Sequence, residues 1–237
     1  MTRSLTEKRA QITEIFSSLQ GEGPRMGERH LFIRFEACHM NCAYCDEAGK
    51  SAKTMSVADV LREVARLERC SGPHVCVSLT GGEPLLYADF LKPLYRALKN
   101  RKYRVLLETS GILWQQLSKV IDGCDVIAMD LKLSSVTGQK GFLAEHRKFL
   151  RLAKKKEIYI KVVISRDVNK REYIEHLHMV AEVAPRTPVF LQPLSVKKRA
   201  YPDLGLMRFL DELQRIGAKR LTDVRVGIQL HKLLNIR

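Results

Sequence analysis

Short apolar segments alternate with longer amphipathic segments along most of this chain. Six of the short segments are apolar at nearly every position and rich in β-branched residues, at positions 31–35, 75–79, 104–107, 125–130, 158–164 and 189–191. This pattern is typical of strands that are buried on both faces, as in parallel sheets. The hydrophobic pattern therefore predicts about six buried parallel strands.

The segments between these strands repeat their apolar residues at helical spacing. In the first of these segments the apolar positions are 57, 60, 61, 64 and 67. Ser56 precedes them, and Asp59, three residues after Ser56, completes an N-terminal capping pair. Helices are predicted over 57–67, 89–99, 141–154, 170–183 and 202–216. Six β/α units are too few to close an eight-stranded barrel. We predict an α/β fold in which residues 1–237 form one domain, an open, partial TIM-like barrel; a doubly wound sheet fits the same alternation.

Polar and glycine-rich residues follow the predicted strands where each strand ends. The loop after the first strand carries three cysteines, and the loop after the second reads Thr-Gly-Gly-Glu-Pro at 80–84. Residues 108–111, 130–132 and 192–193 follow the third, fourth and sixth strands. Because α/β folds place their sites on the loops at the carboxyl ends of the strands, these loops are the predicted location of a functional site.

Composition and charge narrow the class of protein. Hydrophobic residues make up 45% of the 237, which excludes a disordered chain, and no apolar stretch approaches the roughly 20 residues that span a bilayer. The basic residues 1–9 run into no apolar signal core, so we expect a cytoplasmic protein that does not enter a membrane. The net charge of +15 suits an anionic partner or substrate. The basic residues are spread along the chain without a nucleic-acid-binding motif, so we expect solvated surfaces and no nucleic acid partner.

Three of the six cysteines are closely spaced, in the pattern C-x3-C-x2-C at Cys38, Cys42 and Cys45. Three thiolates can hold three irons of a [4Fe–4S] cluster and leave the fourth iron open for a ligand. Zinc, with His39 as a fourth ligand, is an alternative, although zinc usually takes two separated pairs of ligands. Purely structural cysteines are a third alternative.

The dispersed cysteines at 70, 76 and 124 lie in or beside apolar segments and are predicted to be buried.

The cysteine pattern resembles the signature of the radical S-adenosylmethionine (SAM) superfamily. The resemblance implies that the open iron binds the amino and carboxylate groups of SAM, whose reductive cleavage gives a radical that abstracts a hydrogen atom. It implies that Tyr44, before the last cysteine, packs near the adenine. The stretch Gly81-Gly82-Glu83-Pro84 is similar to the superfamily's GGEP motif, which contacts the SAM amino group.

The N-terminal segment resembles the 7-carboxy-7-deazaguanine synthase family. Residues 16–24, which read FSSLQGEGP, precede Gly27 and the segment 32–35, and the resemblance extends to the Gln-Leu-His stretch at 229–231. The resemblance implies substrate contacts at Leu19, Gln20, Gly21, Glu22, Arg34 and Thr80, with His231 as a further candidate. It implies that SAM is lined by Gly82, Glu83, Asp130, Leu131, Lys132, Gln192, Pro193, Leu194 and Ser195.

The implied reaction is a ring contraction of 6-carboxy-5,6,7,8-tetrahydropterin to 7-carboxy-7-deazaguanine, with loss of ammonia and regeneration of SAM. This is a step of queuosine and archaeosine (7-deazapurine) biosynthesis. The family also implies a homodimer and an electron donor such as flavodoxin or ferredoxin. Family members usually have Cys-Asp-Thr where this chain has Cys45-Asp46-Glu47, and the Thr helps to hold Mg²⁺. A carboxylate is a good Mg²⁺ ligand, so we predict that Glu47 retains the site.

Two other functions share part of this pattern. A radical SAM activase of a glycyl-radical enzyme has the same triad and a compact size, but a different N-terminal segment. A non-catalytic iron–sulfur or zinc module that binds nucleic acid would use the net positive charge. It would leave the GGEP stretch and the Gln20–Glu22 segment without a role.

Overall fold

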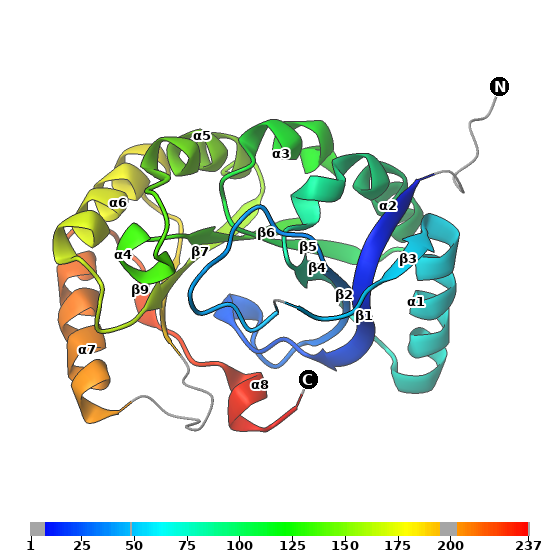
Figure 1. The fold of residues 1–237 in the computed structure, drawn as a ribbon, viewed down its shortest axis with the longest axis horizontal. Coiled ribbons are helices and arrows are strands. Elements are labelled where there is room, and N and C mark those ends of the chain that lie inside the picture. Colours follow the sequence, from blue (N-terminus) through cyan, green and yellow to red (C-terminus); the bar gives the residue numbers. More distant parts are fainter. Residues whose placement is uncertain (1–7, 48, 195–202, 237) are drawn as a thin grey trace.

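One nine-stranded sheet forms the centre of the computed structural model, which describes residues 8–47, 49–194 and 203–236 (Figure 1). The six predicted strands are confirmed as β2 (Arg29–Phe35), β4 (Cys76–Gly81), β5 (Arg104–Thr109), β6 (Val126–Leu131), β7 (Glu157–Ile164) and β8 (Val189–Pro193). They are parallel and neighbour one another in chain order, and β9 (Val224–Val226) continues the series. Because the order never reverses, the sheet is an open, partial barrel and not a doubly wound sheet.

Two further strands extend the sheet on the other side of β2. The strand β1 (Arg9–Leu19) pairs antiparallel with β2, and β3 (Lys53–Ser56) pairs antiparallel with β1. The hydrophobic pattern did not predict them, because β3 is short and polar and the register of β1 shifts between Ile12 and Glu14. This irregularity interrupts the alternation of apolar and polar residues that marks a half-buried strand.

Helices cover the convex side of the sheet (Figure 1). The predicted helices are confirmed, with ends shifted by up to four residues, as α1 (Val57–Ser71), α2 (Ala88–Asn100), α5 (Leu143–Ala153), α6 (Lys170–Val183) and α7 (Leu204–Ala218). The predicted start of the last helix, residue 202, lies outside the described residues. The capping pair before α1 is present in both directions, from Asp59 N to Ser56 Oγ and from Ser56 N to Asp59 Oδ2. Three shorter helices were not predicted: α3 (Trp114–Val120), α4 (Ser134–Thr137) and α8 (Leu230–Leu233).

The concave side of the sheet has an apolar lower layer and a polar upper layer. The lower layer is a small buried cluster of Cys76, Leu106, Val126, Ala128, Tyr159 and Phe190. Successive side chains of a strand point to opposite faces, so the residues two positions further along point to the same concave side. These are Glu108 on β5, Asp130 on β6, Lys161 on β7 and Gln192 on β8. The strand period alone therefore gathers a ring of polar side chains at the carboxyl ends of the strands.

The three dispersed cysteines differ in burial. Cys76 and Cys124 are buried, as predicted, whereas the prediction for Cys70 was wrong. Cys70 is exposed, because α1 continues beyond residue 67 into a last turn that projects into solvent. Among the described residues, no helix is both long and apolar enough to cross a bilayer.

A tight turn enters the concave side from the end of β1. A 3-10 turn over Gly23–Arg25 places Gly23 at a φ of +68°, with its Cα against the ring of Tyr159. A Cβ atom on Gly23 would lie 2.4 Å from Tyr159 Cε2, which is far below a van der Waals contact. Tyr159 has little freedom to move, since it is buried and packs edge-on against Phe190. Only glycine therefore fits at position 23.

We predict that Gly23→Ala lowers the free energy of unfolding by about 3 kcal/mol, from the left-handed backbone and from overpacking against Tyr159. Gly27→Ala is the matched control, because Gly27 has a φ of +88° and open space around its Cα. It loses only the backbone part, about 1–2 kcal/mol. Urea unfolding monitored by circular dichroism measures both values. Equal losses in the two variants would contradict the packing of Gly23 against Tyr159.

Candidate functional site

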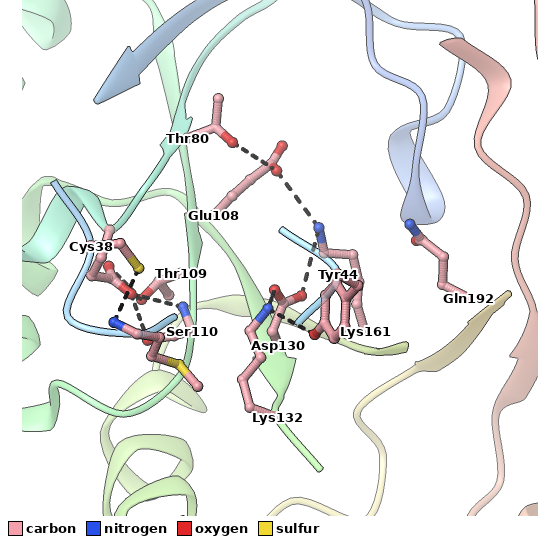
Figure 2. Close-up of polar contacts among 12 residues, drawn as sticks. Cys38, Tyr44, Thr80, Glu108, Thr109, Ser110, Asp130, Lys132, Lys161 and Gln192 are labelled. Carbon is pink, nitrogen blue, oxygen red and sulfur yellow. Dashed lines mark hydrogen bonds and ion pairs between the residues drawn. The ribbon is translucent and has the colours of Figure 1, made fainter. Parts of the chain in front are cut away.

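The ammonium group of Lys161 lies at the centre of the polar ring. Its Nζ is 2.8 Å from Glu22 Oε2, 3.6 Å from Glu108 Oε2 and 3.7 Å from Asp130 Oδ1. Lys161 is 8% exposed, and burial alone would lower the pKa of its ammonium. The charges of Glu22, Asp130 and Glu108 outweigh burial and raise this pKa well above its ordinary value. Lys161 is thus a permanent cation enclosed by three carboxylates. Figure 2 shows two of them, Glu108 and Asp130.

Glu22 comes from the turn after β1 and is held by donors from three distant parts of the chain. Its Oε2 meets Lys161, and its Oε1 accepts hydrogen bonds from Gln192 Nε2 at 2.7 Å and Gln229 Nε2 at 2.8 Å. Burial would raise the pKa of this carboxyl. The charge of Lys161 and the three hydrogen bonds reverse the effect and lower the pKa to about 2.

Glu108 links the same turn to the sheet. Its Oε1 accepts a hydrogen bond from Gln20 Nε2 at 3.1 Å. Its Oε2 accepts one from Thr80 Oγ1 at 3.2 Å, which Figure 2 shows. Gln20 is 3% exposed, and its Oε1 accepts the backbone N–H of Glu22 at 3.1 Å. The predicted residues Gln20, Glu22 and Thr80 are therefore brought together on one side of Lys161.

The other side of Lys161 faces the cysteine loop. Lys132 Nζ lies 2.8 Å from Asp130 Oδ2 and 3.4 Å from the hydroxyl of Tyr44, and it also lies over the Tyr44 ring (Figure 2). Burial raises the pKa of the Tyr44 hydroxyl to about 12, so Tyr44 remains neutral, and its oxygen accepts the hydrogen bond from Lys132. Asp130 thus contacts both lysines, and it connects the Glu22 side of the ring to the loop that carries the cysteines.

The cysteine loop, residues 36–47, follows β2 and is tied down by backbone hydrogen bonds. Ala43 N donates to Thr137 O at 3.1 Å, and Met40 N donates to Cys38 Sγ at 3.4 Å. Cys38, Cys42 and Cys45 are all free thiols, and each is at least partly exposed. No three His, Cys, Asp or Glu side chains within residues 8–47, 49–194 and 203–236 are gathered closely enough to hold a metal ion. The donor set still fits an iron–sulfur cluster in chemistry, because three unpaired thiols share one short loop.

The GGEP stretch packs against the start of this loop. Gly82 N donates to Phe35 O at 2.8 Å, and a Cβ atom on Gly82 would lie 2.3 Å from Ala37 O. Glu83 is fully buried, and its carboxylate accepts hydrogen bonds from the Thr109 hydroxyl and from both the hydroxyl and the backbone N–H of Ser110. The side chain of Glu83 therefore joins the ends of β4 and β5, while the backbone of the stretch faces the cysteine loop.

Two predicted residues lie outside the ring and pair with each other. Arg34 Nε is 3.3 Å from Glu47 Oε2, and its Nη1 donates to Glu14 Oε2 at 3.2 Å. The other oxygen of Glu47 lies 2.8 Å from Lys50 Nζ. In this structure the charge of Glu47 is thus balanced by two cations. Arg34 also lies over the ring of Phe16, on the concave side of β2.

The C-terminal segment covers the turn that carries Glu22. Leu230 N donates to Gly21 O at 3.0 Å, and His231 packs so closely that a Cβ atom on Gly21 would lie 2.1 Å from its Nδ1. Figure 1 shows α8 at the mouth of the barrel, beside this turn. Lys232 Nζ lies 3.4 Å from Asp46 Oδ2, so the same segment also reaches the cysteine loop.

The remaining predicted residues have mainly structural surroundings. Leu19 ends β1, and Leu131 and Pro193 are buried at the ends of β6 and β8. Leu194 N donates to Ile164 O at 2.8 Å, which fixes the chain as it leaves β8. Ser195, the last residue predicted to line SAM, lies outside the described residues.

Lys161 was not identified from the sequence. Glu108 and Gln229 lie in the segments 108–111 and 229–231 that the sequence singled out, but they were given no contact. Lys161 is the one charged residue inside an otherwise apolar strand after its first position, and a buried lysine requires carboxylate partners. Glu108, the penultimate residue of β5, is likewise a charged residue that follows apolar strand positions. These two signals were available in the sequence. Gln229 belongs to the ring only because α8 folds back over Gly21, which no local pattern indicates.

This chain is similar to known proteins over nearly its whole length. Residues 32–182 match the family model of the radical SAM superfamily. A 7-carboxy-7-deazaguanine synthase of Geobacter sulfurreducens is 34% identical, with 95% of this chain and 97% of the relative covered. The protein of the same name from Methanopyrus kandleri is 32% identical, over 94% and 93% of the two chains. The crystal structure of QueE from Escherichia coli has the same fold, with a TM-score of 0.66, 23% identity and coverage of 95% and 96%.

Glu22 gives the site a defined dependence on pH. Its pKa is about 2 in the folded chain against an ordinary value of 4.5, so its ionised form stabilises the fold fully above pH 4.5. This contribution, on the order of 3 kcal/mol, is lost as the pH falls toward 2. We predict that wild-type stability in urea falls more steeply between pH 4.5 and pH 3 than that of Glu22→Gln. Parallel pH profiles for the two proteins would contradict the Glu22–Lys161 pair.

Proposed function

Because this chain belongs to the 7-carboxy-7-deazaguanine synthase family of the radical SAM superfamily, we propose that it contracts the ring of 6-carboxy-5,6,7,8-tetrahydropterin to 7-carboxy-7-deazaguanine. Loss of ammonia balances this conversion without an added oxidant, so SAM serves as a cofactor that is regenerated. The observation that carries the proposal is the buried polar ring around Lys161, which faces the cysteine loop across Asp130.

The charge of the ring supports a substrate with an N–H-rich edge. Three carboxylates, on Glu22, Glu108 and Asp130, face two ammonium groups, on Lys161 and Lys132, so the described ring has one excess negative charge. The aminopyrimidinone edge of a pterin presents N–H donors beside a carbonyl acceptor, which carboxylate and amide side chains can read. Lys161 keeps Glu22 ionised and therefore available as an acceptor. We assign the turn Leu19, Gln20, Gly21 and Glu22, together with Thr80 and His231, to the substrate.

The opposite side of the ring is assigned to the cofactors. Cys38, Cys42 and Cys45 would hold the [4Fe–4S] cluster, and when bound, the cluster and SAM supply the one-electron chemistry that removes a hydrogen atom from the substrate. Gly82 and Glu83 are assigned to the amino group of SAM, with Glu83 acting by fixing the backbone of its own stretch. The residues assigned to the rest of SAM are Tyr44, Asp130, Leu131, Lys132, Gln192, Pro193, Leu194 and Ser195. The role of the protein is to orient the two molecules and to exclude water.

Arg34 and Glu47 are assigned to the carboxylate of the substrate. The guanidinium group of Arg34 can bind a carboxylate through two hydrogen bonds once it is released from Glu47. We propose that Mg²⁺ binds Glu47, whose Oε2 is buried and accepts no hydrogen bond from the described residues. A bound Mg²⁺ would replace the two cations that balance Glu47 here and free Arg34 for the substrate.

We predict that Mg²⁺ raises the turnover of EDTA-treated wild-type enzyme and has little effect on Glu47→Gln. Glu14→Gln is the matched control, because Glu14 also pairs with Arg34 but is not assigned to the metal. This control should respond to Mg²⁺ as the wild type does. Full activity of the wild type in EDTA would contradict the metal assignment and leave the ring contraction unaffected.

The wider setting is proposed on the family alone. We propose a cytoplasmic homodimer that receives electrons from a flavodoxin or ferredoxin. Analytical ultracentrifugation and reduction by purified flavodoxin test these two statements separately from the reaction.

The experiment that tests the function is anaerobic reconstitution with iron and sulfide, followed by assay with SAM, dithionite and 6-carboxytetrahydropterin. We expect 7-carboxy-7-deazaguanine in the wild type and none in Cys42→Ala. Cys70→Ala is the matched control, because Cys70 is exposed and distant in sequence from the triad, and it should retain full activity. Cleavage of SAM by the wild type without this product would limit the assignment to the superfamily.

A further inference from the structure

Two histidines are buried side by side near Lys132, on the side of the polar ring that faces the cysteine loop. His146 on α5 is 0% exposed and His176 on α6 is 2% exposed. Their ring centroids are 5.6 Å apart, and the rings are inclined by 65°. Neither residue belongs to the site described above, and a buried imidazole needs partners for both of its nitrogens.

The backbone around His146 determines which of its nitrogens carries the proton. Lys132 N donates to His146 Nε2 in a long hydrogen bond of 3.4 Å. A backbone N–H can only donate, so Nε2 has the lone pair and Nδ1 has the proton. This Nδ1 is buried and has no hydrogen-bond partner among the described residues. His146 is thus a neutral ring with one unpaired donor.

His176 has the complementary arrangement. Its Nδ1 lies 2.8 Å from the carbonyl oxygen of Glu172. A carbonyl can only accept, so Nδ1 has the proton, and in this tautomer Nε2 has the lone pair. This Nε2 is also buried without a partner among the described residues. His146 has an unpaired donor and His176 an unpaired acceptor, and one shared water can bridge two such atoms.

The two histidines connect α6 to the loop that faces the cysteines. His146 accepts from the backbone of Lys132, whose side chain contacts Asp130 and Tyr44. A second connection runs in parallel from the same helix. The carboxylate of Glu172 accepts the backbone N–H groups of Ser134 and Ser135 at the start of α4, and Thr137 at the end of α4 accepts Ala43 N of the cysteine loop.

We propose that His146, oriented by His176, is a positioning residue that holds the backbone of Lys132 in the conformation that binds SAM. This inference rests on the proposed function for the identity of the ligand, but the contacts that carry it are those of the free chain. Helix α6 supplies the rigid support, and the two packed imidazole rings transmit it to the end of β6.

The electrostatics of the pair agree with this role. Burial is the main cause that lowers the pKa of His146 to about 3, and the neighbouring His176 lowers it further, while the backbone of Ser110 opposes the shift. His146 therefore stays neutral at physiological pH, and its Nε2 remains available to Lys132.

The first test is the tautomer of each histidine in the wild-type chain, measured from ¹⁵N chemical shifts of the rings. We expect His146 to have the proton on Nδ1 and the lone pair on Nε2, and His176 to have a proton on Nδ1. A proton on Nε2 of His146, or a charged His146 ring, would overturn the proposal. This test needs no cofactor, no substrate and no variant.

The second test removes the acceptor and then restores it. His146→Leu should speed hydrogen exchange of the Lys132 amide and weaken binding of SAM to the reconstituted protein about tenfold. His146→Gln places a carbonyl oxygen within reach of Lys132 N, and it should recover most of both effects. His178→Leu is the matched control, because it removes an exposed imidazole from α6, the helix of His176, and should change neither value. If His146→Leu does not fold, two results decide the proposal. They are the tautomers in the wild type, and the Lys132 amide exchange and SAM affinity of His146→Gln compared with the wild type.

The outcomes separate this inference from the proposed function. The wild type could have the expected tautomers and a protected Lys132 amide but make no deazaguanine product. This result would contradict the proposed reaction and leave the positioning role of His146 intact. Unchanged amide exchange and unchanged SAM affinity in a folded His146→Leu would overturn the support, whether or not the enzyme makes product.

Discussion

The interaction on which the site depends is the enclosure of the Lys161 ammonium by the carboxylates of Glu22, Glu108 and Asp130. The three acids come from the turn after β1 and from the ends of β5 and β6, so one cation joins parts of the chain that are far apart in sequence. Removing a buried cation would leave its partners uncompensated, at a cost of about 3–5 kcal/mol. The pKa of Glu22, about 2, shows how strongly its charge is favoured in this position.

The sheet explains why this arrangement forms without long loops. Alternation along β5, β6, β7 and β8 gives an apolar layer below and the polar ring above, each supplied by residues two positions apart. The apolar layer, with Tyr159 and Phe190, closes the lower part of the concave side, while Gly23 allows the N-terminal turn to settle on Tyr159. The turn then delivers Glu22 to Lys161. The apolar packing around Tyr159 therefore positions the turn that brings Glu22 to Lys161.

Much of this architecture follows from the sequence. The six parallel strands were predicted from apolar runs, and the cysteines, the GGEP stretch and Gln20–Glu22 were found as motifs. The places of Lys161 and Gln229 in the ring were not predicted, for different reasons. Lys161 gave a local signal, a charge at a buried strand position, whereas Gln229 reaches the ring only through the packing of α8 on Gly21. The pairing of Arg34 with Glu47 is also a tertiary contact, and sequence had suggested a role for each residue without linking them.

The central claim is that the ring around Lys161 binds the pterin through an ionised Glu22. The most direct measurement is the affinity of the reconstituted protein for 6-carboxytetrahydropterin in the presence of SAM, by calorimetry, in the wild type and in Glu22→Gln. Glu212→Gln, which removes an exposed carboxylate from α7, is the control. The account predicts that Glu22→Gln binds the pterin at least about tenfold more weakly, while the control binds normally. Equal affinity in folded wild type and Glu22→Gln would contradict it.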